Sequence, residues 1–147
     1  QAVSRGLGDV YKRQIKSESK NISQMEIENI HSLKTGKLIE CAVMLGQLEN
    51  TSSNEKIFKS FGRNIGLAFQ IIDDYLEATS SSKKLGKDIN SDHKNKKSTY
   101  INIVGIDKSL ERSEELVKSA IDEINDEKIS NSEMLIELAR YITKREK

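Results

Sequence analysis

Two adjacent carboxylates, Asp73 and Asp74, stand in the most apolar stretch of the chain, GLAFQIIDDYLE at 66–77. Glu77 follows one helical turn later and adds a third carboxylate. Carboxylate oxygens are the ligands that Mg²⁺ prefers, and phosphate oxygens and water complete its octahedron. The residue types and their spacing therefore indicate a site for Mg²⁺ together with a diphosphate.

The acidic residues share one face of the helix that this stretch predicts. At ~100° per residue, one narrow sector holds Gln70, Asp73, Asp74 and Glu77. Gly66 lies in the same sector and leaves room for a ligand or another helix. The alternative is a solvated face, since an exposed like-charge pair costs only ~0.2–0.5 kcal/mol. No lysine within the turn pairs the carboxylates, which favours the metal site.

Basic residues flank this stretch at three places. Lys34 and Thr35 are predicted to open a helix, where backbone N–H groups favour an anion. Lys87 lies in the loop after the acidic helix, and Lys97 opens a short helix beyond it. A metal–diphosphate site needs both signs of charge, but in a chain with 24 Lys and Arg these lysines also fit an ordinary solvated surface.

Composition predicts an all-α chain with a modest core. The 147 residues suffice for one domain, include no proline, and are rich in helix formers. A net charge of +1 argues against the basic field of nucleic-acid binders. The single Cys41 allows no internal disulfide, and no stretch is long and apolar enough to span a membrane or to form a signal peptide. We therefore expect a cytoplasmic protein.

The hydrophobic periodicity predicts where the helices lie. We expect helices over 24–33, 35–48, 55–78, 97–104, 110–124 and 134–142, with a long loop over 79–95. In the second helix, Cys41 and five further residues are predicted to be buried: Leu38, Ile39, Ala42, Val43 and Leu45. His31 and His93 lack metal-ligand spacing and are expected to be structural. Residues 1–14 show no periodicity and are expected to be a non-native or disordered terminus.

Four motifs in order resemble one enzyme family. They are LKTGKLI (33–39), GLAFQIIDDYLE (66–77), LGKDINSD (85–92) and KKSTY (96–100). Together they resemble the C-terminal half of a trans-isoprenyl diphosphate synthase, closest to bacterial short-chain farnesyl or geranylgeranyl diphosphate synthases. The resemblance covers roughly residues 22–147, and we expect one domain over 15–147.

The resemblance implies a fold and a reaction. Helices would surround a deep apolar cavity, and an allylic diphosphate would condense with isopentenyl diphosphate. Mg²⁺ held by two aspartate-rich motifs would assist departure of the diphosphate. The resemblance also implies a homodimer for the complete enzyme.

The resemblance also assigns roles to single residues. Asp73 and Asp74 match the second aspartate-rich motif and would bind Mg²⁺, while Glu77 replaces the usual final Asp of that motif and would bind directly or through water. Gln70 would lie near the reacting allyl group. The residues that match the diphosphate-binding positions are Lys34, Thr35, Lys87, Lys97 and, in the C-terminal tail, Arg145. The residues that would take part in catalysis are Lys34, Thr35, Gln70 and Lys87.

Half of the family pattern has no match in this chain. The first aspartate-rich motif and the residues that would bind isopentenyl diphosphate do not occur upstream. We therefore expect the isolated chain to be inactive and poorly folded, because half of a helical barrel exposes apolar faces. Three alternatives stay open: a terpene cyclase-like enzyme, a non-catalytic helical subunit of a heteromeric synthase, and a purely structural bundle.

Overall fold

Helices make up every regular element of the described chain. The structure is a computed structural model that describes residues 22–47, 54–85 and 99–145. The elements in chain order are α2 (Gln24–His31), the π-helical turn η1 (Ser32–Gly36), α3 (Lys37–Gln47), α4 (Glu55–Leu85), α5 (Tyr100–Val104), α6 (Ile106–Asp126) and α7 (Glu133–Lys144). No strand occurs within these ranges, so the predicted all-α class is confirmed.

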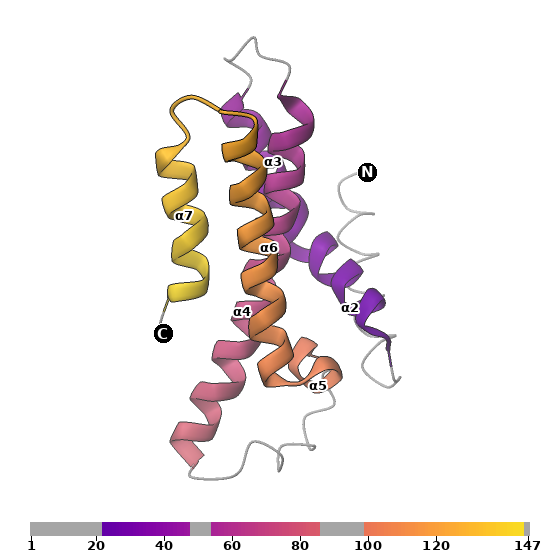
Figure 1. Cartoon of the computed structure of the whole chain (residues 1–147). Coiled ribbons are helices and arrows are strands. Elements are labelled where there is room, and N and C mark those ends of the chain that lie inside the picture. The colour runs from indigo at the N-terminus through magenta and orange to yellow at the C-terminus, as the bar shows by residue number, and fades with distance from the viewer. Residues whose placement is uncertain (1–21, 48–53, 86–98, 146–147) are drawn as a thin grey trace.

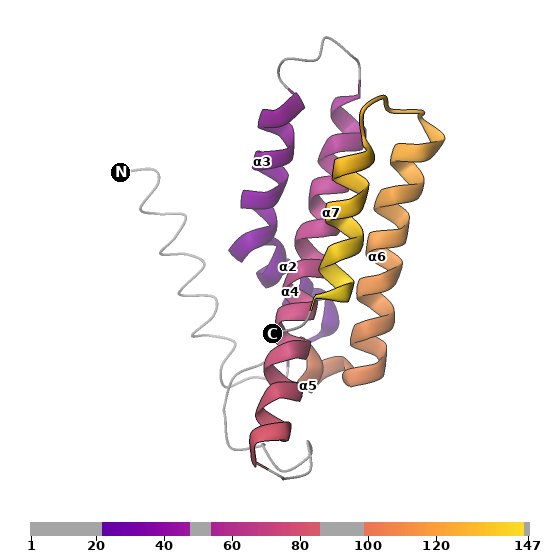
Figure 2. The ribbon, with the colours of Figure 1, turned by 90° about the vertical axis from the view of Figure 1, so that its left-hand side faces the viewer.

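The longest helix, α4, runs through the middle of the structure and carries the predicted acidic face. Figure 2 shows α3, α7 and α6 around its N-terminal half, while α5 lies beside its C-terminal half. Figure 1 shows that α2 runs at an angle to α3. Every other described element therefore packs against α4, directly or through a neighbour.

Apolar side chains of α4 and α6 form most of the core. The buried apolar residues are Ile27, Phe61, Ile65, Ala68, Ile71, Ile72, Tyr100, Leu116, Val117, Ala120, Ile121, Ile124, Ala139 and Ile142. They recur at the three- and four-residue spacing of amphipathic helices. The predicted apolar stripe over 110–124 is thus confirmed. In the helix predicted over 134–142, Ala139 and Ile142 are buried and Leu135 packs against the core, but Met134 and Leu138 are exposed.

Two glycines allow η1 and α3 to approach α4 very closely. A Cβ atom at position 66 would lie 2.6 Å from the Cα atom of Gly36, and one at position 62 would lie 2.7 Å from the Cα atom of Glu40. The expectation that Gly66 permits close approach is therefore confirmed, and the neighbour is a helix. Glu40 itself is buried and accepts bonds from Lys37 at 2.7 Å and Arg63 at 3.3 Å. Burial opposes its ionisation, but these two cations outweigh burial and hold the pKa of Glu40 below its usual value.

The chain stays helical where the sequence predicted two breaks. Lys34 and Thr35 do not open a helix, because η1 joins α2 to α3 with a π-helical bond from the Lys37 N–H to the Ser32 carbonyl. Their backbone N–H groups therefore do not lie at a helix N-terminus. The loop predicted from Thr79 is also wrong up to Leu85, because no glycine or proline interrupts α4 there. The Thr79 hydroxyl donates to the Tyr75 carbonyl at 2.9 Å.

One predicted buried face is largely exposed. Ile39 and Val43 pack against the core, but Cys41 and three other predicted core residues of α3 are exposed: Leu38, Ala42 and Leu45. Leu138 and Tyr141 on α7 are exposed as well. The periodicity was read correctly as helical, but α4 covers only one side of α3. The expectation that the isolated chain is poorly folded stays a prediction.

Replacing Gly66 by alanine tests the close approach of η1 to α4. The added methyl group would meet backbone atoms, so we expect Gly66→Ala to lower the free energy of unfolding by ~1–3 kcal/mol. Gly46→Ala is the matched control, because nothing lies within 4 Å of its Cβ position and alanine is the better helix former. Urea unfolding followed by circular dichroism measures both. Equal stability of the two variants would contradict the contact.

Candidate metal and diphosphate site

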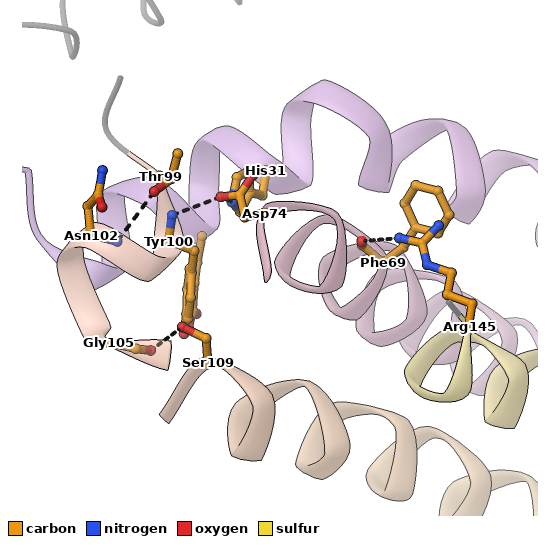
Figure 3. A network of polar contacts seen from close by, with 10 residues as sticks. His31, Phe69, Asp74, Thr99, Tyr100, Asn102, Gly105, Ser109 and Arg145 are labelled. Atoms are coloured by element: carbon orange, nitrogen blue, oxygen red, sulfur yellow. Dashed lines mark hydrogen bonds and ion pairs between the residues drawn. The ribbon is translucent and has the colours of Figure 1, made fainter. Parts of the chain in front are cut away.

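Asp74 is held by two donors from other helices. Its Oδ2 atom accepts a hydrogen bond from the Tyr100 backbone N–H at 2.8 Å and lies 3.2 Å from His31 Nε2 (Figure 3). The side chain of Asp74 is only 18% exposed, and that of His31 is 6% exposed. Asp74 of α4 therefore joins α2 and the first residue of α5.

The side chain of Tyr100 joins α5 to α2. Its ring stacks on the His31 ring with centroids 6.2 Å apart. Its hydroxyl donates to Glu28 Oε1 at 2.8 Å and accepts from Gln24 Nε2 at 3.0 Å. Burial raises the pKa of the Tyr100 hydroxyl, and the neighbouring Glu28 carboxylate raises it further. Tyr100 thus stays a neutral hydrogen-bond donor at physiological pH.

Asp73 has a cationic partner. Its Oδ1 atom is paired with the Arg145 guanidinium, which follows α7. The same Arg145 nitrogen donates to the Phe69 carbonyl at 3.2 Å, and the guanidinium carbon lies 4.1 Å from the centroid of the Phe69 ring. Figure 3 shows Arg145 reaching from α7 to Phe69. The predicted C-terminal basic residue therefore lies beside a predicted metal ligand.

The π-helical turn places Lys34 and Thr35 beside α4. At the start of the turn His31 contacts the half-buried Asp74, and at its end Gly36 lies against Gly66. Lys34 is exposed and Thr35 is half-buried. The predicted diphosphate-binding pair thus lies between two contacts with α4, one at each end of the turn.

The remaining predicted residues differ in their surroundings. Gln70 is buried one turn before the two aspartates, whereas Glu77 is exposed one turn after Asp73. Lys87 and Lys97 lie outside the described residues, as does the terminus at 1–14. Their predicted roles stay predictions.

The two aspartates suit Mg²⁺ in one particular binding mode. Within residues 22–47, 54–85 and 99–145, no three His, Cys, Asp or Glu side chains cluster so that they could hold a metal ion together. Mg²⁺ is commonly held by one or two carboxylates, with substrate phosphates and water completing its shell. Asp73 is 47% exposed and already faces a positive charge, so its surroundings accommodate a cation. The residues fit a Mg²⁺ ion bridged to a diphosphate and do not form an all-protein cage.

An apolar pocket lies beside this site. It has a volume of about 840 Å³ and lies between α3, α4, α7 and the turn before α7. Its apolar lining includes Ile39, Val43, Phe58, Ile65, Phe69 and Leu135. Arg145 also lines it, so the pocket reaches the partner of Asp73. A ligand with a charged head and an apolar tail fits this arrangement.

Sequence reasoning did not give His31 or Tyr100 a place in the site. His31 was expected to be structural, and the structure puts its ring against a predicted metal ligand. Their positions in the sequence could have indicated a place in the site. His31 lies one helical turn before Lys34, and Tyr100 ends the last of the four motifs. Thr99 caps α5 by accepting from the Asn102 N–H at 3.3 Å, so this helix begins at Tyr100 and not at the predicted position 97.

Comparisons with known proteins agree with the geometry. The sequence pattern of the family described as polyprenyl synthetase matches residues 6–139. A geranylgeranyl diphosphate synthase of Cyanophora paradoxa is 42% identical over 113 residues, which cover 75% of this chain and 38% of the relative. The chain therefore spans well under half the length of that relative.

Two solved structures share the fold. A geranylgeranyl pyrophosphate synthase superposes with a TM-score of 0.77 at 20% identity, covering 97% of this chain and 58% of the other. A geranyltransferase from Helicobacter pylori, complexed with magnesium and isoprenyl diphosphate, superposes with a TM-score of 0.65 at 20% identity, covering 89% of this chain and 43% of the other. At these identities the likeness shows the fold alone.

None of the described helices is long and apolar enough to cross a membrane.

Replacing Arg145 tests whether it competes with a cation for Asp73. We expect Arg145→Gln to tighten the binding of Mg²⁺ alone by ~3–10-fold, because the carboxylate loses its counter-charge. Arg140→Gln is the control, since it removes the same charge from an exposed position on α7. Isothermal titration with MgCl₂ measures both. Weaker Mg²⁺ binding by Arg145→Gln than by Arg140→Gln would contradict competition.

Proposed function

The chain belongs to the polyprenyl synthetase family, and we propose that it forms the C-terminal half of a prenyltransferase. The reaction is condensation of an allylic diphosphate with isopentenyl diphosphate, of the farnesyl or geranylgeranyl diphosphate synthase type. The observation that carries the proposal is the position of the Asp73–Asp74 pair. It lies on a helix whose core-facing side is apolar, beside an apolar pocket of about 840 Å³.

Each part of the site supplies one requirement of the reaction. Asp73 and Asp74, with Glu77 nearby, form the acidic wall that would hold a Mg²⁺ ion. Mg²⁺, when bound, offsets the charge that develops on the departing diphosphate. Diphosphate oxygens that the cation leaves uncovered pair with Lys34, Thr35, Lys87, Lys97 and Arg145.

The apolar pocket and Gln70 serve the other end of the substrate. The apolar pocket lining would hold the hydrocarbon chain of the allylic substrate. Gln70 is buried next to the carboxylates and contacts the site near the reacting allyl group. The binding site for isopentenyl diphosphate and the first metal-binding motif would lie in a part of the domain that this chain does not cover. The complete enzyme works as a homodimer in the cytoplasm.

Binding of inorganic diphosphate tests the site. We expect binding by the chain to require Mg²⁺, and Asp73→Asn to weaken it at least 10-fold, or ~1.4 kcal/mol. Isothermal titration with and without MgCl₂ measures this, and Asp126→Asn on the distant end of α6 serves as the charge-matched control. Equal affinity with and without Mg²⁺ would favour the purely structural bundle.

The isolated chain is expected to lack turnover. It supplies one acidic wall, whereas the family mechanism uses two, so we expect no prenyl transfer above the blank with Mg²⁺, an allylic diphosphate and radiolabelled isopentenyl diphosphate. Adding the upstream half of the Cyanophora paradoxa relative as a separate chain is the complementary test. Turnover by the isolated chain would sink the assignment of this chain as half of the site.

A further inference from the structure

We propose that the two adjacent aspartates have different tasks: Asp73 binds the cation, and Asp74 is a positioning residue fixed by His31 and the Tyr100 amide. This inference rests on the proposed function, because the tasks are defined at its metal site. Asp73 is 47% exposed, and its partner is the Arg145 side chain at the end of the described chain. Asp74 is 18% exposed, and its partners come from the helices that cover it.

The bonds of Asp74 engage one of its two carboxylate oxygens, Oδ2, and tie it to the fold. A carboxylate oxygen has about two lone-pair sites, and Oδ2 of Asp74 faces two donors. One is the Tyr100 N–H at 2.8 Å, and the other is His31 Nε2 at 3.2 Å. We assign the imidazole proton to Nε2, since a carboxylate oxygen can only accept. Oδ2 is therefore committed to protein partners, in contrast to the carboxylate of Asp73.

His31 depends on this contact as much as Asp74 does. Its side chain is 6% exposed, and its Nδ1 atom is buried without a partner. Among the described residues, the contact between Nε2 and Asp74 is therefore the polar contact that offsets the burial of the His31 ring. Such a ring is suited to hold a neighbour in place, and its position next to Asp74 makes it a positioning residue too.

The contacts form a closed ring of three helices. Asp74 of α4 bonds to the start of α5, the Tyr100 hydroxyl bonds to Glu28 of α2, and α2 returns to Asp74 through His31. The ring of bonds fixes the end of α2 against α4, and η1 with Lys34 follows directly. Asp74 thus acts on the diphosphate-binding side of the site without contacting the diphosphate.

Matched asparagine variants separate the two tasks. Asn keeps an oxygen that accepts from the Tyr100 amide but removes the charge that a metal needs. With inorganic diphosphate as the probe, we expect the Mg²⁺ concentration at half-saturation to rise at least 10-fold in Asp73→Asn and less than 3-fold in Asp74→Asn. Isothermal titration at a series of Mg²⁺ concentrations measures both. An equal rise in the two variants would overturn the division of tasks.

Hydrogen exchange at the Tyr100 amide reports positioning without any ligand. We expect Asp74→Ala to speed exchange of this amide at least 10-fold, while Asp73→Ala changes it less than 2-fold. His31→Leu is expected to speed exchange as well, and His31→Gln, which keeps a donor, to restore part of the protection. Unaltered exchange in Asp74→Ala would overturn the positioning role.

The two measurements also separate this inference from the proposed function. If the unmodified chain binds diphosphate equally with and without Mg²⁺, the proposed function fails and the cation-binding task of Asp73 fails with it. The exchange rates then still decide whether Asp74 positions α5. If Mg²⁺-dependent binding is present and Asp74→Asn loses it as Asp73→Asn does, the function stands and this inference fails.

Discussion

The backbone contact between Gly36 and Gly66 is the constraint on which the site depends. Any side chain at position 66 would meet the Cα atom of Gly36 at 2.6 Å, so the two helical segments approach more closely than side chains normally allow. This contact fixes one end of η1 on α4, and His31 fixes the other end two helical turns along α4. The chain between these two contacts follows the short π-helical turn η1.

Close packing of this kind makes it possible to bury charge beside the site. Asp74 is mostly shielded from water, a position that would be costly for an unpaired carboxylate. The Tyr100 amide and the His31 ring offset that cost, and hydrogen bonds to a charged acceptor are about twice as strong as neutral ones. Because the donors come from α2 and α5, the partly buried charge helps to align these two helices with α4. Electrostatics and packing therefore act on the same three elements.

The sequence was most informative where one helix decides the outcome. The order of helices, the core stripe of α6 and the acidic face of α4 follow from three- and four-residue spacing alone. Contacts between helices could not be predicted from this spacing. The π-helical path through Lys34 and Thr35 depends on α4 being close enough to hold it, and a Lys-Thr-Gly sequence by itself reads as a break.

Other differences have the same origin. The exposure of Leu38 and Cys41 follows from how much of α3 its neighbours cover, which periodicity does not report. The role of His31 was missed because its partner is 43 residues away and no spacing rule connects them. The resemblance supplied residue roles that periodicity could not, and it did so through motif order.

The charge on the site is balanced in two separable ways. Asp74 has donors that belong to the fold, whereas Asp73 has Arg145, a residue just beyond the last helix that also rests on the Phe69 ring. A guanidinium stacked on an aromatic face keeps part of its stabilisation when its carboxylate partner is lost. The Arg145 guanidinium therefore has two anchors on α4, the Asp73 carboxylate and the Phe69 residue, and both hold it beside the pocket.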